Sequence, residues 1–372
     1  MKKKNKIGDY LLMILFFFVI LEVSSFITIK LYLKNYGIIY SHKVDKNYDK
    51  YLKKRHEILG WDTSSKNVDD YGARKDYSSY SESNPCIDVY GDSFTYGHYK
   101  PEKAWPSLLS ELVNCRVRNF GVDGFGSDQA YIKFLINTKH SKIVFLNHLS
   151  ENIIRNVNQY RNFIYPSNDY LFKPRYILQD NELKLIPLPN IPKEKISEYL
   201  VNPKKYLKYE YFIPNGPSGI QYWKFPYTFR VLKSFNHWAI KQKIQNISVS
   251  YNNFYEIDHL SNGLNLTFKI MSNFYENLKK QELVPIITIF PTCKDLQYFS
   301  KYKKLPYDNL IRLFENENYL FIDFGSIFLE KSKKNHDRFY KECSGHYNED
   351  GEVLVAETIL KYLKSNNLLS NL

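Results

Sequence analysis

Five short apolar segments alternate with helix-like segments between residues 86 and 365, and this alternation constrains the fold more than any other feature of the chain. The strand-like segments are residues 86–90, 116–122, 142–149, 284–290 and 319–324. Helical patterns cover residues 105–113, 127–137, 266–283 and 352–363. Such alternation predicts a parallel sheet with helices on both faces. We therefore expect an α/β fold of the flavodoxin-like, three-layer type, with functional groups beyond the carboxyl ends of the strands.

The N-terminus carries an apolar run, YLLMILFFFVILEVSSFITI at residues 10–29, with Glu22 as its one charged residue. A bilayer core needs about 20 apolar residues. Four lysines precede the run and two follow it closely. The larger positive charge before the run favours a cytoplasmic N-terminus, although the lysines after the run reduce the difference in charge between the two flanks. We predict a cytoplasmic tip and single-pass anchor over residues 1–34, with the rest of the chain on the extracytoplasmic side of a bacterial membrane. A cleaved signal peptide is the alternative.

The remaining chain divides by composition. Residues 35–84 are polar and rich in Tyr, Asp and Ser, and we expect them to form a stalk. Residues 85–366 form the predicted α/β domain, interrupted by an insertion at about 155–260 that is rich in Pro and aromatic residues. We interpret the insertion as a cap over the functional site, while a surface insertion without a role is equally compatible. Within it, Asp180 and Asn181 separate two alternating runs and could form the turn of a hairpin.

Charge and cysteine content restrict the function classes. The formal net charge is +13, but the lysines are scattered beyond the first six residues, so we predict no nucleic-acid binding. An anionic membrane surface or an acidic polysaccharide fits this charge better. Four cysteines in an exported chain allow three disulfide pairings, and the sequence does not choose among them. The strand positions make Cys86–Cys115 and Cys293–Cys343 the pairings to test, with four reduced thiols as the alternative.

Three motifs lie at strand or helix ends. The first strand ends in Gly-Asp-Ser-Phe-Thr-Tyr-Gly at residues 91–97, which presents a serine at the carboxyl edge of the sheet. A serine hydroxyl becomes a nucleophile only beside a base, and its reaction needs donors for the oxyanion. The second motif follows the second strand at residues 119–129, and the third, at residues 345–351, precedes the last helix. We expect Asp92 to shape the serine turn, and Asp128 and Gln129 to cap and pack the following helix.

These three motifs resemble the first, second and last blocks of the SGNH/GDSL hydrolase family, and they occur in the same order. The resemblance implies that Ser93 is the nucleophile and that its backbone N–H helps to bind the oxyanion. It implies that the N–H of Gly124 is a further donor and that His346 is the base. Together the blocks cover most of residues 86–365 and leave out the anchor, the stalk and the insertion.

Two features depart from the family pattern. The family usually has Gly-x-Asn-Asp after the third strand, where the Asn amide completes the oxyanion hole. In this chain Asn152 is the best match, with Asn147 and His148 as rivals.

The second departure concerns the acid. The family usually has an Asp two or three residues before its His, where this chain has Ser344 and Cys343. Asp337, Glu342 or a residue of the insertion could replace that acid, or Ser93 and His346 could act as a dyad.

The combined pattern predicts a serine esterase or O-acyltransferase that works through an acyl-serine intermediate on O-acyl groups of cell-envelope carbohydrate. The alternatives are a lipid or small-ester hydrolase and a catalytically retired glycan-binding or assembly protein on the same fold. The expected partners are an ester or O-acylated carbohydrate and the lipid bilayer. We expect no cofactor, and no metal because the histidines lack ligand spacing. Arg155 could meet an anionic substrate group, although a solvated salt bridge is the simpler interpretation.

Overall fold

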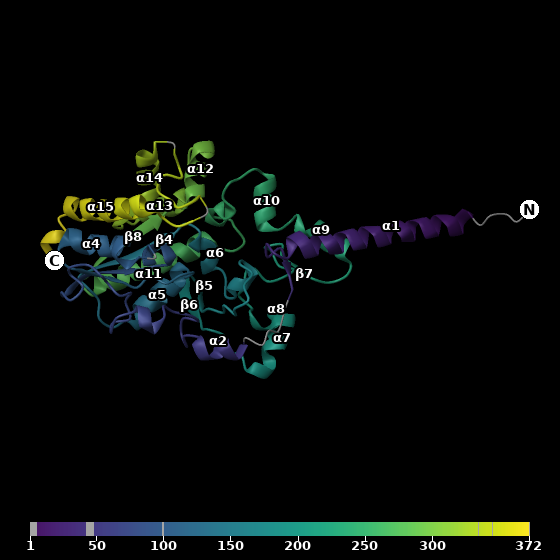
Figure 1. The fold of residues 1–372 in the computed structure, drawn as a ribbon, viewed down its shortest axis with the longest axis horizontal. Helices are drawn as coiled ribbons and strands as arrows, with labels where there is room; N and C mark the ends of the chain where they lie inside the picture. The colour runs from purple at the N-terminus through teal and green to yellow at the C-terminus, as the bar shows by residue number, and fades with distance from the viewer. Residues whose placement is uncertain (1–5, 42–47, 99, 334, 344, 372) are drawn as a thin grey trace, which may run out of the picture. The chain divides into compact units, whose positions relative to one another are not determined.

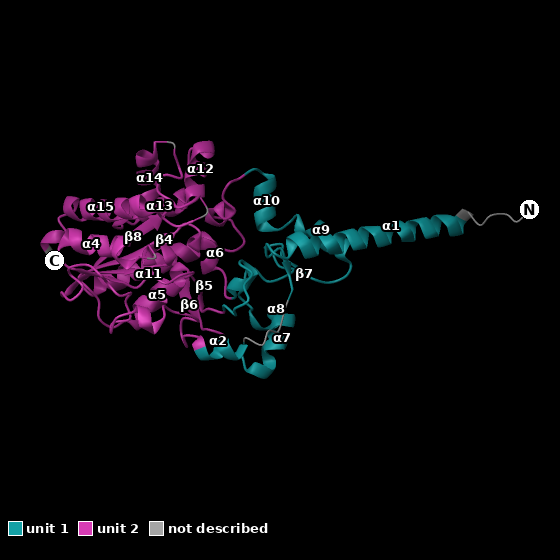
Figure 2. Cartoon of the chain, in the orientation of Figure 1, with its two compact units in different colours: residues 1–53, 160–171, 190–246 teal, residues 54–159, 172–189, 247–372 magenta. Residues whose placement is uncertain are grey.

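The computed structural model describes residues 6–41, 48–98, 100–333, 335–343 and 345–371. It consists of two compact units (Figure 2). Unit 1 contains residues 1–53, 160–171 and 190–246, and unit 2 contains residues 54–159, 172–189 and 247–372. This division differs from the sequence-based one. No boundary between the units falls at residue 34 or residue 84, and the residues of the predicted insertion at 155–260 are divided between the two units.

Unit 2 is built on a five-stranded parallel sheet in the order β3-β2-β4-β8-β9. Its strands are β2 (Pro85–Tyr90), β3 (Arg116–Asn119), β4 (Ile143–Leu149), β8 (Val284–Phe290) and β9 (Phe321–Asp323). Numbered along the chain, these five strands have the order 2-1-3-4-5, which is the flavodoxin-like arrangement. The predicted fold class is therefore confirmed, and each predicted strand corresponds to one strand of the sheet.

Helices cover both faces of this sheet (Figure 1). One face carries α4 (Trp105–Val113), α14 (Phe324–Ser332) and α15 (Glu349–Ser365). The other face carries α5 (Ser127–Ile136) and α11 (Gly263–Lys280), where Phe134 contacts both Tyr90 of the sheet and Phe274 of α11. The two apolar layers leave the carboxyl ends of the strands free to carry polar groups.

Short helices begin directly after the strands at that edge. These helices are α3 (Ser93–Tyr96) after β2, α6 (Asn152–Asn156) after β4 and α12 (Cys293–Tyr302) after β8, with α13 (Asp308–Asn316) following α12. A separate antiparallel hairpin joins β5 (Arg175–Gln179) to β6 (Glu182–Ile186). Its turn residues Asp180 and Asn181 have φ values of 52° and 62°. Two positive φ values are what a two-residue hairpin turn needs, so the predicted hairpin is confirmed.

Both disulfide pairings singled out from the strand positions are formed, and none of the four cysteines is a free thiol. Cys86 and Cys115 join the amino ends of β2 and β3. Cys293 and Cys343 join the start of α12 to the loop before α15, at the opposite edge of the sheet. One disulfide therefore lies far from the predicted site and the other beside it.

Unit 1 begins with the apolar helix α1 (Lys6–Thr28), continued by the π-helical turn η1 (Ile29–Leu33). Its two-stranded parallel sheet pairs β1 (Ile39–Tyr40) with β7 (Gln221–Tyr222). The other helices that begin in this unit are α2 (Tyr48–Lys54), α7 (Ile196–Val201), α8 (Pro203–Tyr206), α9 (Tyr227–Ser234) and α10 (Trp238–Ile244). The span Ile7–Leu33 is long and apolar enough to cross a membrane, and a signal sequence would have the same properties.

Candidate active site

The turn between β2 and α3 positions Ser93. Asp92 caps α3, since its Oδ1 accepts a hydrogen bond from the Phe94 N–H at 2.9 Å, which is the shaping role expected from the sequence. A side chain at Gly91 would place Cβ 2.0 Å from Thr95 Oγ1, so the tight turn requires glycine. Ser93 is half-buried at the first position of α3. Its hydroxyl makes no hydrogen bond within the described part of the chain.

A small hairpin before α15 carries His346. Tyr340 pairs with Tyr347, and the Lys341 N–H donates to the His346 carbonyl at 2.9 Å. The His346 ring is exposed and packs on the ring of Phe94, with centroids 4.9 Å apart. Phe94 directly follows Ser93, so the fold brings the histidine to the serine turn. Among the described residues the imidazole makes no hydrogen bond.

The loop after β3 lies against the same turn. The Val122 N–H donates to the Gly91 carbonyl at 3.1 Å, and the Phe125 N–H donates to the Val122 carbonyl at 3.3 Å. Gly124 is the third residue of the resulting β-turn and has a φ of 75°. A positive φ at this position favours glycine. The loop is thus fixed beside the serine turn by its own backbone.

Asn152, at the start of α6, is completely buried, yet neither atom of its amide has a hydrogen-bond partner of normal geometry among the described residues. Burial raises the pKa of the nearby Asp92 carboxyl, and the charge of Arg155 and the Asn152 amide each offset part of that rise. A buried amide without a good partner costs free energy, so such a group in a folded protein calls for an explanation.

The rival residues of β4 are both engaged. Asn147 donates to Thr95 at 3.0 Å and accepts from Thr288 at 2.6 Å. His148 is hydrogen-bonded through both ring nitrogens, to Ser127 at 2.7 Å and to Tyr255 at 2.8 Å. Burial lowers the pKa of His148 to about 3, so its ring is neutral. Of the three candidates, Asn152 alone has an amide without a hydrogen-bond partner of normal geometry among the described residues, although the amide does interact with the Asp92 carboxyl.

Arg155 joins the serine turn to the loop after β3. Its guanidinium contacts Asp92 Oδ2 at 3.3 Å and donates to the Phe125 carbonyl at 3.0 Å and to Glu151 at 2.7 Å. Arg155 is 7% exposed, so this is a buried ion pair and not the solvated one expected from the sequence. The Arg155 guanidinium is therefore bound to protein groups, and it links the serine turn to the loop after β3.

Asp128 and Gln129 act at the start of α5, as expected. Gln129 Oε1 accepts from the Gly126 N–H at 3.3 Å, and Asp128 Oδ1 accepts from the Gln129 N–H at 2.8 Å. The other Asp128 oxygen is 2.5 Å from Lys173 Nζ, in an ion pair that is buried on both sides. Nothing in the sequence indicates this partner, which is 45 residues away.

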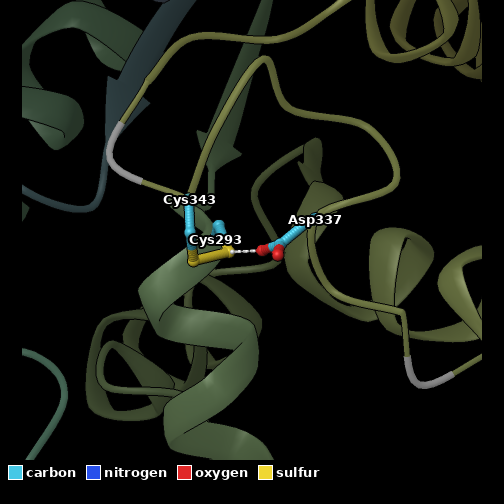
Figure 3. Close-up of side chains that lie close together, drawn as sticks. All are labelled: Cys293, Asp337 and Cys343. Carbon is cyan, nitrogen blue, oxygen red and sulfur yellow. Dashed lines mark hydrogen bonds between the residues drawn. A yellow bond between two sulfur atoms is a disulfide. The ribbon is translucent and has the colours of Figure 1, made fainter.

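The two candidate acids make contacts other than a hydrogen bond to the imidazole. Asp337 is exposed, and its carboxylate is 2.9 Å from the Cys293 sulfur of the Cys293–Cys343 disulfide (Figure 3). A disulfide sulfur carries no hydrogen, so this is a close contact and not a hydrogen bond. Glu342 is exposed in the hairpin turn, where its carbonyl accepts from the Gly345 N–H at 2.8 Å. Neither carboxylate is hydrogen-bonded to His346 within the described residues.

The position of the family acid is occupied by the disulfide itself. Cys343 stands three residues before His346, while Ser344 lies outside the described residues. The cluster of Asp337 with the two cysteines resembles a metal site in spacing, since the potential ligand atoms lie within 4.8 Å of one another. Metal ligation by cysteine requires a thiolate, and here both sulfurs are bonded to each other.

The fold and the site thus define a flavodoxin-like α/β protein with a serine turn, a histidine hairpin and a buried amide at one edge of the sheet. No family model and no curated protein matches the chain.

The chain is, however, similar to solved structures over 75% of its length. They include a G-D-S-L family lipolytic protein from Veillonella parvula (14% identity, 97% of that chain, TM-score 0.36) and a candidate lipolytic protein of that family from Desulfitobacterium hafniense (12%, 100%, 0.33). LAE5, an α/β hydrolase from a Lake Arreo metagenome, matches at 10% identity over 94% of its chain with a TM-score of 0.38. At such low identities and scores, the chemistry must be argued from the residues of this chain alone.

Proposed function

We propose that this protein is a serine esterase or O-acyltransferase that works through an acyl-serine intermediate. His346 takes the proton of the Ser93 hydroxyl as Oγ attacks the ester carbonyl. The resulting oxyanion is bound by the backbone N–H groups of Ser93 and Gly124 and by the Asn152 amide. His346 then returns the proton to the leaving alcohol as the carbonyl–oxygen bond breaks. Water, or a hydroxyl of a second substrate, releases the acyl group by the same steps.

The observation that supports this proposal most is the unsatisfied amide of Asn152. It is buried next to Asp92, the residue that caps the serine helix, and it lacks a good partner. An oxyanion hole is a site where donors wait unpaired for a charge that develops only during the reaction. The free energy that this buried amide costs in the resting protein is explained if the reaction intermediate supplies its acceptor.

For the substrate, we propose O-acyl groups of cell-envelope carbohydrate. The N-terminal apolar helix, interpreted as an anchor, would hold the enzyme at an envelope membrane, and the basic net charge of +13 suits an anionic surface or polymer. The same residues serve hydrolysis and transfer, because the outcome depends on whether water or an acceptor hydroxyl reaches the acyl-serine.

The decisive experiment measures p-nitrophenyl acetate turnover by the full chain in detergent, for the wild type and for Ser93→Ala, His346→Ala and Ser127→Ala. Ser127 is a matched control because it is a buried serine whose hydroxyl is hydrogen-bonded to His148. We expect Ser93→Ala and His346→Ala to abolish turnover and Ser127→Ala to retain it. Labelling by a fluorophosphonate should require Ser93.

One observation favours a different class of protein. The His346 ring has no hydrogen-bonded carboxylate among the described residues, so nothing described orients its tautomer. A retired enzyme that binds glycans would have the same arrangement. Absence of both turnover and fluorophosphonate labelling in the folded wild type would support that function and count against the esterase.

A further inference from the structure

Helix α9 lies along the second half of α1 within unit 1, and Glu22 connects the two (Figure 1). The Glu22 carboxylate accepts hydrogen bonds from the Tyr227 N–H at 2.6 Å and the Thr228 N–H at 3.1 Å. These are the first N–H groups of α9, which have no partner inside their own helix. Ser25 and Thr228 add a hydroxyl contact at 3.1 Å. The one acidic residue of the apolar run therefore serves as the cap of a second helix.

Aromatic contacts extend this pairing along α1. Phe26 packs edge-on against Trp223 and Tyr227, with centroid distances of 5.4 and 5.2 Å. Phe18, two turns earlier, contacts Phe225 at 6.4 Å. Glu22 is 7% exposed, whereas the α1 side chains from Leu11 to Leu21 are 43–66% exposed. The part of α1 from Leu11 to Phe17 is thus largely exposed, and the part from Phe18 to Phe26 is contacted by residues 223–228.

Helix α9 and its flanking residues, which contact α1, also carry exposed apolar side chains. Phe225, Phe229, Leu232 and Phe235 are 45–62% exposed. The spacing of three residues places Phe229, Leu232 and Phe235 on one side of α9 and its C-terminal end, and Phe225 precedes the helix. The same segment carries two cations, Arg230 and Lys233, which lie over the Phe229 ring at 5.5 and 4.6 Å from its centroid. An exposed apolar stripe with basic residues beside it is typical of helices at a membrane interface.

We infer that α9 enters the lipid bilayer beside α1, with the Phe229 and Leu232 side in the acyl chains and Arg230 and Lys233 directed to the head groups. This inference depends on the proposed role of α1 as an anchor. Lipid is the occupant because the stripe lies on a helix that contacts α1, whose surface lipid must cover if α1 spans the membrane. Trp223 is of the type enriched at such interfaces.

The depth of Glu22 agrees with this inference. The span Ile7–Leu33 has 27 residues and is about 40 Å long, against a hydrocarbon core of about 30 Å. Glu22 is about 16 Å from the end of the span, so it lies about 6–16 Å inside the core for any placement of an untilted helix. A carboxylate at that depth is costly unless it has donors. The N-terminal N–H groups of α9 supply them, provided that α9 reaches the same depth.

Site-directed fluorescence on the full chain in vesicles tests the inference. All four native cysteines are in disulfides, so single cysteines at Leu15, Leu232 and Val353 can be labelled with an NBD fluorophore. All three side chains are exposed, and Val353 lies on α15 in unit 2. We expect the labels at 15 and 232 to be quenched by nitroxide lipids and protected from aqueous iodide. The label at 353 should behave in the opposite way.

Three results would overturn the inference, and each has a different meaning. Iodide quenching at 232 with lipid quenching at 15 would show a true anchor with α9 in water. Protection of 232 from both quenchers would indicate that a second copy of the chain covers the stripe. Iodide quenching at both positions would remove the anchor itself. None of these results depends on ester turnover, so they are separable from failure of the proposed function.

A substitution at Glu22 tests the link between the two helices. Glu22→Gln keeps an oxygen acceptor for the α9 N–H groups, and Glu22→Leu removes it. We expect the label at 232 to stay lipid-quenched in Glu22→Gln and to lose at least half of that quenching in Glu22→Leu, while the label at 15 is unchanged in both. Equal quenching at 232 in the two variants would contradict the capping role.

Discussion

Cys343, three residues before His346, is bonded to Cys293 at the first position of α12. The disulfide ties the histidine hairpin to the connection that follows β8. The hydroxyl groups of Tyr340 and Tyr347 reinforce the tie, because both donate to the Pro291 carbonyl, at 2.9 and 3.4 Å. The place that an acid holds in the resembled family is occupied here by a covalent link, and we expect this link to position the imidazole.

Removal of the Cys293–Cys343 disulfide should lower the catalytic rate even under conditions in which the protein remains folded. The chain-entropy relation gives about 4 kcal/mol for a disulfide that closes a loop of 50 residues. We expect Cys293→Ala with Cys343→Ala to lower the thermal midpoint and, in assays well below that midpoint, to lower kcat for p-nitrophenyl acetate at least tenfold.

The second disulfide supplies the matched control. Cys86 and Cys115 close a loop of 29 residues at the amino ends of the strands, for which the same relation also gives about 4 kcal/mol. Their double alanine variant should lose similar stability and keep its kcat. Equal loss of kcat in both variants would mean that the Cys293–Cys343 bond does not position His346.

The Asn152 amide should act on the rate and not on the fold. Loss of one oxyanion donor costs about 10²–10³ in kcat. We expect Asn152→Ala to lose that much with little change in KM or in thermal midpoint, because no good hydrogen bond is broken. Asn156→Ala on the same helix is the control. Asn156 is hydrogen-bonded to Asp128 and Thr267, so its variant should lose stability and retain kcat.

The buried pair of Asp128 and Lys173 should show strong coupling. Lys173→Met leaves a buried carboxylate without its cation, which costs about 3–5 kcal/mol. Lys173→Met combined with Asp128→Asn should recover most of the loss, as measured by denaturant unfolding. An exposed pair is the control, and Lys205→Met, which breaks the contact with Glu198, should leave unfolding unchanged. A double variant less stable than Lys173→Met would contradict this account.

Glu352 should make the stability depend on pH. Burial raises the pKa of its carboxyl from 4.5 to about 8, and its Oε2 accepts from the Trp105 N–H at 2.9 Å. The folded protein therefore keeps a proton that the unfolded chain releases above pH 4.5. This contribution to stability falls as pH rises from 4.5 to 8, by at most about 1.4 kcal/mol per pH unit.

Glu352→Gln keeps the acceptor and cannot ionise. Its thermal midpoint should equal that of the wild type near pH 5 and exceed it near pH 8. A constant difference between the two proteins across this range would show that Glu352 is ionised in the fold.

The sequence predicts the sheet well because β4 and β8 are nearly continuous apolar runs, as is usual for buried parallel strands, and all five expected segments became strands. β2 and β3 contain buried polar residues and were predicted from their alternation and from their place between helical segments. The errors lie at the ends of elements. β3 stops at Asn119, not at 122, because the chain at Gly121 passes α3 so closely that a Cβ there would lie 2.3 Å from the Tyr96 nitrogen. α15 starts at Glu349, three residues early, since Asn348 caps it by accepting from the Gly351 N–H.

Some features of the candidate site and of unit 1 could not be predicted from local sequence patterns. Ser93 could be found from its place after a strand, while the roles of Gly124 and His346 depended on the family resemblance. The unsatisfied state of Asn152 exists only in the packed structure, because burial and hydrogen bonding are tertiary properties. Likewise, β1 and β7 have two residues each and pair across more than 180 residues, which no periodicity can reveal.

Unit 1 is assembled from three separate stretches of chain, the last of which ends at residue 246. During synthesis, α1 leaves the ribosome long before its partners exist. Tyr227 follows Glu22 by 205 residues, which takes roughly 10–40 s at usual translation rates. Throughout that interval Glu22 has no helix to cap, and any membrane insertion of α1 begins with a carboxylate that still needs its donors. The order of translation therefore makes the capping of α9 by Glu22 one of the last contacts of α1 to form.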